Sequence, residues 1–256
     1  MPKHTSFITY LLARIDAIRL NGTNLGETFV GHEHLDYRAT EPIFTSLLVA
    51  LVIIYLAVEV RSQLRKLDES VIPEDKLTLR TFFETFFSYF YGMMKDVMGP
   101  TNAKRYLPLI GGSAIFIFGS NALALLPGFN PPTSNLNVTL GCSLLIFLAF
   151  NFFGLKENGW GYIAHLAGPK WYLAPLIFPI EVISTCVRPV TLSLRLMINM
   201  AVDHLVAGIF LGMVALLLPV PLMFLAIIVV LVQTLVFCLL SSIYIGLATE
   251  HADEHH

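Results

Sequence analysis

The chain has 256 residues, of which 55% are hydrophobic and 13% are charged, and its mean hydropathy is +0.71. The charged fraction is about half that of a soluble domain, which excludes ordinary soluble proteins and predicts an all-α membrane protein with several crossings. A formal net charge of −2 is too close to neutral to suggest nucleic acid as a partner.

The first transmembrane helix is predicted over residues 42–60, an apolar stretch about long enough for one crossing. In the preceding segment, 1–41, charged residues interrupt the apolar run 7–20, which favours an amphipathic surface helix over a signal peptide. A basic excess follows the first crossing: Arg61, Arg65, Lys66, Lys76, Arg80, Lys95, Lys104 and Arg105. Because such an excess marks the cytoplasmic side, we expect residues 1–41 to lie outside.

Residues 61–106 are expected to form a cytoplasmic segment with one amphipathic helix. Apolar side chains recur in it at intervals of three and four: Leu79, Phe82, Phe83, Phe86, Phe87, Phe90 and Met94. The pattern predicts a helix lying in the membrane interface. A core helix of a small soluble domain is the alternative, disfavoured because no other element remains to pack on it.

Residues 107–153 are predicted to form a transmembrane hairpin. Its apolar arms, 107–126 and 137–153, are joined by a turn rich in Pro, Gly and Asn that has no Lys or Arg and is therefore expected outside. Asn121 in the first arm either makes a hydrogen bond between helices or lines water.

Residues 172–248 are predicted to form two long helices. Between 180 and 218 the one strong turn signal is Pro189, so a helix of about 40 residues would be about 60 Å long, twice the hydrocarbon thickness of about 30 Å. Such a helix must be strongly tilted. A second long helix over 222–247 brings the total to five crossings in a single membrane domain, 1–256, and places the tail, 249–256, in the cytoplasm.

A row of polar side chains shares one face of the first long helix, with steps of seven, seven, four and four residues: Glu181, Arg188, Arg195, Asn199 and Asp203. Ser184 and Thr191 lie on the flank of this row. An arginine near the bilayer centre costs from about 3 to more than 10 kcal/mol unless protein or water surrounds it, so Arg195 is the strongest functional candidate. A structural ion pair of Glu181 with Arg188 is the alternative for those two residues.

Sequence motifs of common enzymes are absent: there is no Gly-rich phosphate loop, no Gly-x-Ser-x-Gly elbow and no HExxH pair. Cys142, Cys186 and Cys238 lie in apolar runs without metal-ligand spacing. We therefore expect no cofactor and no metal. A stand-alone ion-coupled transporter and an intramembrane serine hydrolase using His204 remain alternatives, although no internal repeat supports the transporter.

The run Arg188-Pro-Val-Thr-Leu-Ser-Leu-Arg-Leu-Met-Ile-Asn-Met resembles the signature of subunit a of the F-type rotary ATP synthase, K/R-P-x-S/T-L-x-x-R-L-x-x-N-M. The resemblance extends to Asn121-Ala-Leu-Ala-Leu-Leu-Pro, the Asn-Val-Thr-Leu start at Asn137, Gln233, and the ending from Tyr244 to Glu250. It covers roughly 200 residues in order.

The resemblance implies a non-catalytic stator subunit that conducts protons through two half-channels. Arg195 would face the carboxylate of a rotating c-subunit ring and, because a guanidinium stays protonated even when buried, would block a direct leak between the half-channels. The implied partners are the c ring, b-type peripheral stalk subunits, the remainder of the ATP synthase and membrane lipid. The implied location is a bacterial inner membrane, or alternatively an organelle energy-transducing membrane.

The site residues that the resemblance implies fall into two groups. Asn121, Asn199, His204 and Gln233 would line the outer half-channel, with Gln233 beside Arg195, and Glu181, Ser184 and Arg188 would lie toward the cytoplasmic exit. The chain departs from many bacterial relatives, which have Glu at the position of His204 and a His where Ala226 stands, and from some that have an acid at Ala124. We expect Asp203 and His204 to form a local proton relay instead.

Overall fold

The computed structural model describes residues 8, 41–64, 78–126, 129–158, 174–213 and 219–249. Helices make up this part of the chain: α3 (Glu41–Leu64), α4 (Leu79–Ala122), η2 (Leu123–Leu125), η3 (Pro132–Ser134), α5 (Leu136–Asn158), α7 (Ala174–Met213) and α8 (Pro219–Thr249). The five α-helices are all long and apolar enough to cross a membrane, which confirms the predicted all-α, multi-pass fold. The predicted N-terminal surface helix and C-terminal tail fall outside the described residues.

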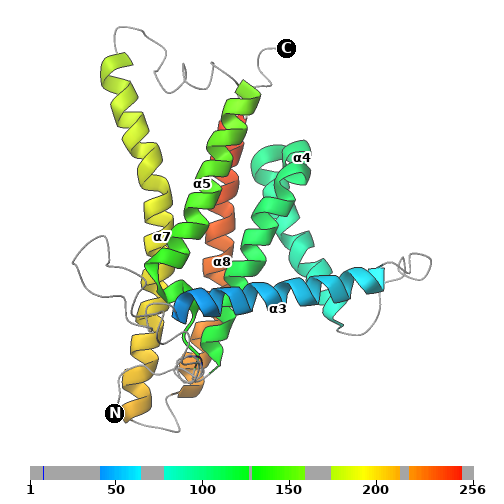
Figure 1. Cartoon of the computed structure of the whole chain (residues 1–256), viewed down its shortest axis with the longest axis vertical. Coiled ribbons are helices and arrows are strands. Elements are labelled where there is room, and N and C mark those ends of the chain that lie inside the picture. The colour runs from blue at the N-terminus through cyan, green and yellow to red at the C-terminus, as the bar shows by residue number, and fades with distance from the viewer. Residues whose placement is uncertain are drawn as a thin grey trace, which may run out of the picture.

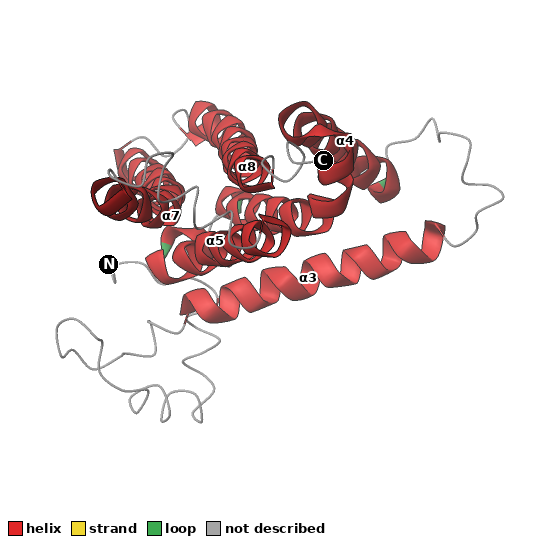
Figure 2. Ribbon diagram, turned by 90° about the horizontal axis from the view of Figure 1, so that it is seen from above, coloured by secondary structure: helices red, strands yellow, loops and turns green. Residues whose placement is uncertain are grey.

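The helices form a bundle with one helix lying across it. Figure 1 shows α4, α5, α7 and α8 in the bundle and α3 running crosswise to them. Seen from above, α3 extends along one side of the bundle (Figure 2). α4 makes its most extensive contacts with α8, and α5 makes its own with α7. Of the predicted turn between 126 and 137, the structure describes η3 and its neighbouring residues. The helices on either side, α4 and α5, pack mainly on other partners.

α4 is itself a helical hairpin. Gly99 has φ 78° and ψ 165°, a backbone conformation that essentially only glycine adopts, and it separates an arm of residues 79–98 from an arm of residues 100–122. Pro100, which has no N–H group, begins the second arm, where a helix leaves that group unpaired anyway. Thr78 caps the first arm because its side chain accepts a hydrogen bond from the backbone N–H of Thr81 at 3.4 Å.

The amphipathic helix predicted after residue 78 is the first arm of this hairpin, and the second arm covers its apolar side. Phe83 packs in one buried cluster with Ile115, and Met94 packs in another with Tyr106 and Ile110. Phe82 remains exposed. The premise that nothing in the chain remained to pack on this helix is therefore wrong, because the Gly99-Pro100 turn brings residues 103–115 back against it.

Hydroxyl groups on several helices donate hydrogen bonds to their own backbone. Each pair below is separated by four residues and joined at 2.8 or 2.9 Å: Thr45 to Glu41, Ser113 to Leu109, Thr234 to Val230, Ser241 to Phe237 and Ser242 to Cys238. A polar side chain can remain inside an apolar bundle when its donor is satisfied in this way.

Small residues bring α8 close to α4. Ser241, Ser242 and Gly246 are buried on α8, and a Cβ atom added at Gly246 would lie 3.4 Å from the Cβ of Met98. Close approach at small residues is a common way of packing helices in membranes, where the lipid provides little hydrophobic drive for association.

α7 has the length that the sequence predicts but begins before the predicted residue 180. Its 40 residues run from Ala174 to Met213, and Pro179 and Pro189 lie inside it. At 1.5 Å per residue its length is about 60 Å. α8, with 31 residues, is about 46 Å long.

Candidate ion-translocation surface

The polar row of α7 lies along the edge of the helix surface that packs on the rest of the bundle. The buried positions of this helix include Thr185, Pro189, Leu192, Ser193, Leu196 and Met200. One step around the helix are the row residues Arg195 and Asn199 and the flanking residue Ser184, which are exposed, and Glu181, Arg188 and Asp203, which are half-buried. The structure therefore brings these predicted site residues onto one continuous strip.

Arg195 is the exposed cation at the centre of this strip. It lies near the middle of α7, and within the described part of the chain it makes no hydrogen bond or ion pair. Ile198, one turn along α7, is an exposed apolar residue, and so are Leu231 and Val232 on α8, which precede the Gln233 that pairs with Asn199. The guanidinium is thus presented outward, where a group from another molecule can reach it.

A hydrogen bond joins α7 to α8 one turn after Arg195. Asn199 Nδ2 donates to Gln233 Oε1 at 2.8 Å, and Gln233 is buried. The sequence predicted Gln233 beside Arg195 on the neighbouring helix. In the structure the amide oxygen of Gln233 accepts a hydrogen bond from Asn199, and this contact fixes the two helices relative to one another one turn from the arginine.

A second pair joins α7 to α8 three turns earlier along α7. The Cζ atom of Arg188 lies 5.1 Å from the centroid of the Tyr244 ring, within the range of a cation–π contact. Arg188 Nη2 is also 3.7 Å from Glu181 Oε1, too long for a charge-assisted hydrogen bond. Both pairs have the same spacing, since Arg188 precedes Asn199 by 11 residues and Tyr244 follows Gln233 by 11. Sequence reasoning missed the role of Tyr244, although this shared spacing could have indicated it.

Asn121 lies away from the α7 strip, at the C-terminal end of α4. Its side chain is fully buried, and its Oδ1 accepts a hydrogen bond from Thr133 Oγ1 of η3 at 2.6 Å. Its Nδ2 atom and the hydroxyl of Ser120 are buried without a partner among the described residues. Of the two predicted roles, the hydrogen bond is therefore present, and it reaches η3, which in turn contacts α7.

The predicted relay of Asp203 and His204 lies near the C-terminal part of α7. Asp203 is half-buried, and the side chain of His204 is outside what the structure describes, so the relay stays a prediction. The same holds for a hydrolase that would use His204. Three buried serines of α7 and α8 are engaged elsewhere: Ser241 and Ser242 donate to their own helix, and Ser193 Oγ is 3.4 Å from Thr139 Oγ1 of α5.

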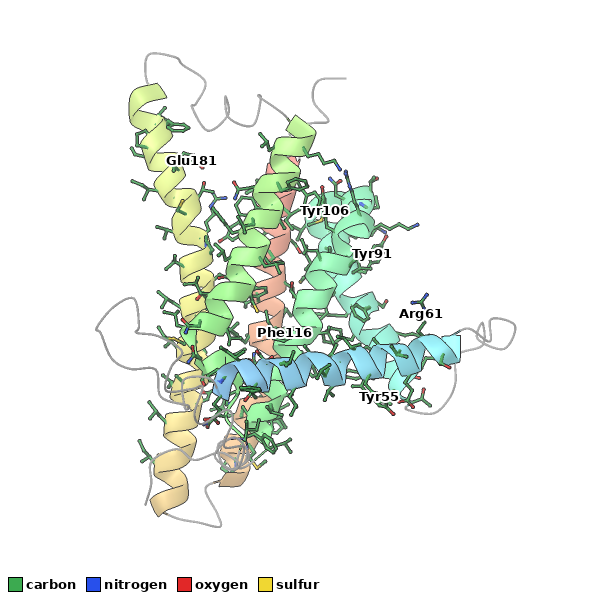
Figure 3. The ribbon with its side chains drawn as sticks, viewed as in Figure 1. Tyr55, Arg61, Tyr91, Tyr106, Phe116 and Glu181 are labelled. Atoms are coloured by element: carbon green, nitrogen blue, oxygen red, sulfur yellow. The ribbon has the colours of Figure 1, made fainter. Side chains whose placement is uncertain are left out.

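Glu181 lies toward the same end of the bundle as Tyr106 (Figure 3). Lys104 and Arg105 precede Tyr106 directly, and both are exposed. The basic residues near the tip of the α4 hairpin and the Glu181 end of the α7 strip therefore lie on the same side of the molecule. Within the described ranges, no three His, Cys, Asp or Glu side chains are placed to hold a metal ion.

The sequence was compared with those of known proteins. The profile of the family described as "ATP synthase A chain" matches residues 43–246. ATP synthase subunit a of Sorangium cellulosum (strain So ce56) is 74% identical over 255 residues, covering 100% of both chains. The corresponding protein of Bdellovibrio bacteriovorus is 39% identical over 223 residues, covering 87% of this chain and 94% of its own. These matches confirm the resemblance drawn from the Arg195 motif, and the chain belongs to the ATP synthase A chain family.

Proposed function

We propose that this chain is the proton-conducting stator subunit of an F-type ATP synthase and that Arg195 stands opposite an ionised carboxylate on a rotating ring of c subunits. The observation that carries the proposal is the exposure of Arg195 near the middle of a long apolar helix, without a partner in the described part of the chain. In this role the subunit conducts ions and orients the ring, and the chemistry of ATP synthesis takes place elsewhere in the complex.

The physical argument starts from the cost of a charge in lipid. A guanidinium facing hydrocarbon at this depth costs at least about 3 kcal/mol, so an exposed Arg195 calls for an anion or water supplied from outside the chain. A carboxylate on a neighbouring subunit meets that need. Because arginine stays protonated, it stabilises the ionised form of that carboxylate and favours release of its proton each time the ring brings a new site past.

Two half-channels on opposite sides of Arg195 complete the proposal. Asn121, Asn199, Gln233 and the relay of Asp203 with His204 would serve the outer one, and Glu181, Ser184 and Arg188 the inner one. The assignment of Glu181 to the cytoplasmic side is supported by its place at the same end of the bundle as Tyr106, next to exposed Lys104 and Arg105 (Figure 3), because basic residues favour that side. Five crossings then place the N-terminal segment outside and the tail in the cytoplasm.

The crossed arrangement of α3 supports a tilted bundle. The axis of α3 is crosswise to those of α7 and α8, so the three helices cannot all lie along the membrane normal (Figure 1). If α3 crosses the membrane along the membrane normal, the bundle helices are strongly tilted away from that normal. A helix about 60 Å long spans a core of about 30 Å when its axis is tilted by about 60°. That tilt would lay α7 and α8 along the side of the c ring.

The remaining partners follow from the family. The chain would work with the rest of the ATP synthase, including b-type peripheral stalk subunits, in a bacterial inner membrane, as the bacterial source of its relatives suggests. The whole chain would act as one membrane domain. No observation favours the transporter or hydrolase alternatives over this role.

The test is ATP-driven proton pumping in inverted vesicles that contain the complete ATP synthase. Arg195→Ala and Arg195→Lys should lose coupled pumping, and Arg195→Ala should raise the passive proton leak after the catalytic sector is removed. Arg61→Ala, which removes an exposed arginine from the last turn of α3, is the matched control and should pump normally. Normal pumping by an assembled Arg195→Ala complex would refute the stator assignment.

A further inference from the structure

We infer that Tyr244 is a positioning residue for the inner half-channel: its ring keeps the Arg188 guanidinium from closing into a short hydrogen bond with the Glu181 carboxylate, so that the carboxylate can take up a proton. This inference rests on the proposed proton-conducting function. It assigns a role to a residue that belongs to α8, across from the strip on α7.

Arg188 contacts both the Tyr244 ring and the Glu181 carboxylate, and the two contacts differ in geometry. The Cζ–centroid distance of 5.1 Å to Tyr244 is inside the limit of about 6 Å for a cation–π contact. The Nη2–Oε1 distance of 3.7 Å to Glu181 exceeds the 2.7–2.9 Å that is typical of an arginine hydrogen-bonded to a carboxylate. The side chains of Arg188 and Glu181 are 28% and 42% exposed, so solvent can reach both. Arg188 therefore lies over the ring and forms with Glu181 an ion pair that lacks a short hydrogen bond.

The Tyr244 ring is held in place from behind. It packs against the buried cluster formed by α4, α5 and α8, and its centroid is 6.4 Å from that of Phe150, which is 3% exposed. The Asn199–Gln233 hydrogen bond, 11 residues away on each helix, fixes the register of α7 against α8. A ring anchored on these two sides offers the guanidinium a fixed surface.

The chemistry explains why the position of Arg188 matters. A carboxylate that accepts two hydrogen bonds from a guanidinium is stabilised in its ionised form and accepts a proton poorly. With Arg188 on the ring, a proton that has left the c ring can form an O–H bond on Glu181. Its release to cytoplasmic water breaks that bond and restores the carboxylate. The arginine remains near enough to favour restoration of the charge without capturing the carboxylate.

The first experiment compares replacements of two tyrosines in vesicles with the complete complex. Tyr244→Leu should slow ATP-driven pumping roughly fivefold to tenfold, because Arg188 is released to hydrogen-bond closely to Glu181. Tyr244→Phe keeps the ring and should restore most of the rate. Tyr91→Leu is the matched control, since Tyr91 is also partly buried against the same cluster but makes no described contact with Arg188. If Tyr244→Leu does not assemble, Tyr244→Met tests the same loss of the ring.

The second experiment asks whether the effect of Tyr244 passes through Arg188. In an Arg188→Gln background the guanidinium is gone, so Tyr244→Leu should cause no further slowing. A purely packing role for Tyr244 predicts the same slowing in both backgrounds, and that result would overturn the inference. So would a Tyr244→Leu complex that pumps like the Tyr91→Leu complex.

Arg195→Ala in the same assay separates the two proposals. If Arg195→Ala loses pumping while Tyr244→Leu does not slow it, the positioning role alone is wrong. If Arg195→Ala pumps normally, the stator function itself is wrong, and the role of Tyr244 fails with it.

Discussion

Asn199 on α7 donates a hydrogen bond of 2.8 Å to the buried amide oxygen of Gln233 on α8. The bond lies one turn from Arg195, so it sets the distance between the two helices at the point where the arginine is presented outward. Amide side chains suit this position, because they make a directional contact without adding a second charge next to the guanidinium.

Replacement of either partner should impair pumping through the position of Arg195. Gln233→Leu and Asn199→Ala should each slow ATP-driven pumping several-fold, because loss of a buried hydrogen-bond partner costs about 1–3 kcal/mol. Since both changes break the same bond, the double variant should be little slower than the slower single variant. Rates that multiply in the double variant would mean that the two residues act independently.

The buried contact of Asn121 with Thr133 should contribute to stability. Thr133→Val removes the hydroxyl with little change in shape and leaves the Asn121 side chain without its described partner, at a cost of about 1–3 kcal/mol. We expect a lower midpoint in thermal unfolding of the purified complex. Ser134→Ala is the control, because Ser134 donates from a partly buried position to Pro131, and its loss should lower the midpoint less.

The turn inside α4 should depend on glycine at position 99. Gly99→Ala forces a side chain into the conformation at φ 78° and ψ 165° and should destabilise the hairpin by about 1–3 kcal/mol. Gly92→Ala is the matched control in the same helix: an added Cβ there meets nothing within 4 Å, and alanine favours the helix by about 0.5–1 kcal/mol. Thermal unfolding should therefore separate the two variants in opposite directions, and equal midpoints would contradict the hairpin geometry.

The close approach of α8 to α4 should not tolerate a larger residue. Gly246→Leu would place its Cβ 3.4 Å from the Cβ of Met98 and its remaining atoms inside the contact, at a cost of about 1–3 kcal/mol. We expect a lower yield of assembled complex in detergent extracts. Gly141→Leu on the exposed surface of α5, where an added Cβ meets nothing within 4 Å, should leave the yield unchanged. An equal loss in both variants would point to a general effect of the substitution.

Much of the fold could be predicted from local properties of the chain. The lengths of the apolar runs predict five helices that can cross a membrane. The helical period of the polar residues predicts the row with Arg195 at its centre. The packing partner of the first α4 arm did not follow, because it depends on the backbone angles of Gly99, which lies in a polar stretch and was not recognised as a turn. The contact of Tyr244 with Arg188 could not be predicted from either helix alone, because it depends on how α7 and α8 are aligned. A periodic pattern within one helix contains no information about that alignment.

Under the proposed function the bundle stands in a membrane that carries a voltage, and the hydroxyl groups that bond to their own helices then have a consequence. Each 100 mV across the membrane does about 2.3 kcal/mol of work on a crossing proton, so any chain of mobile hydrogen bonds through the bundle would act as a short circuit. Thr234, Ser241 and Ser242 each commit their proton to a carbonyl one turn back, on the face of α8 buried in the bundle. These three hydroxyls therefore do not donate their protons to one another, and we expect them to supply no path for protons through the bundle.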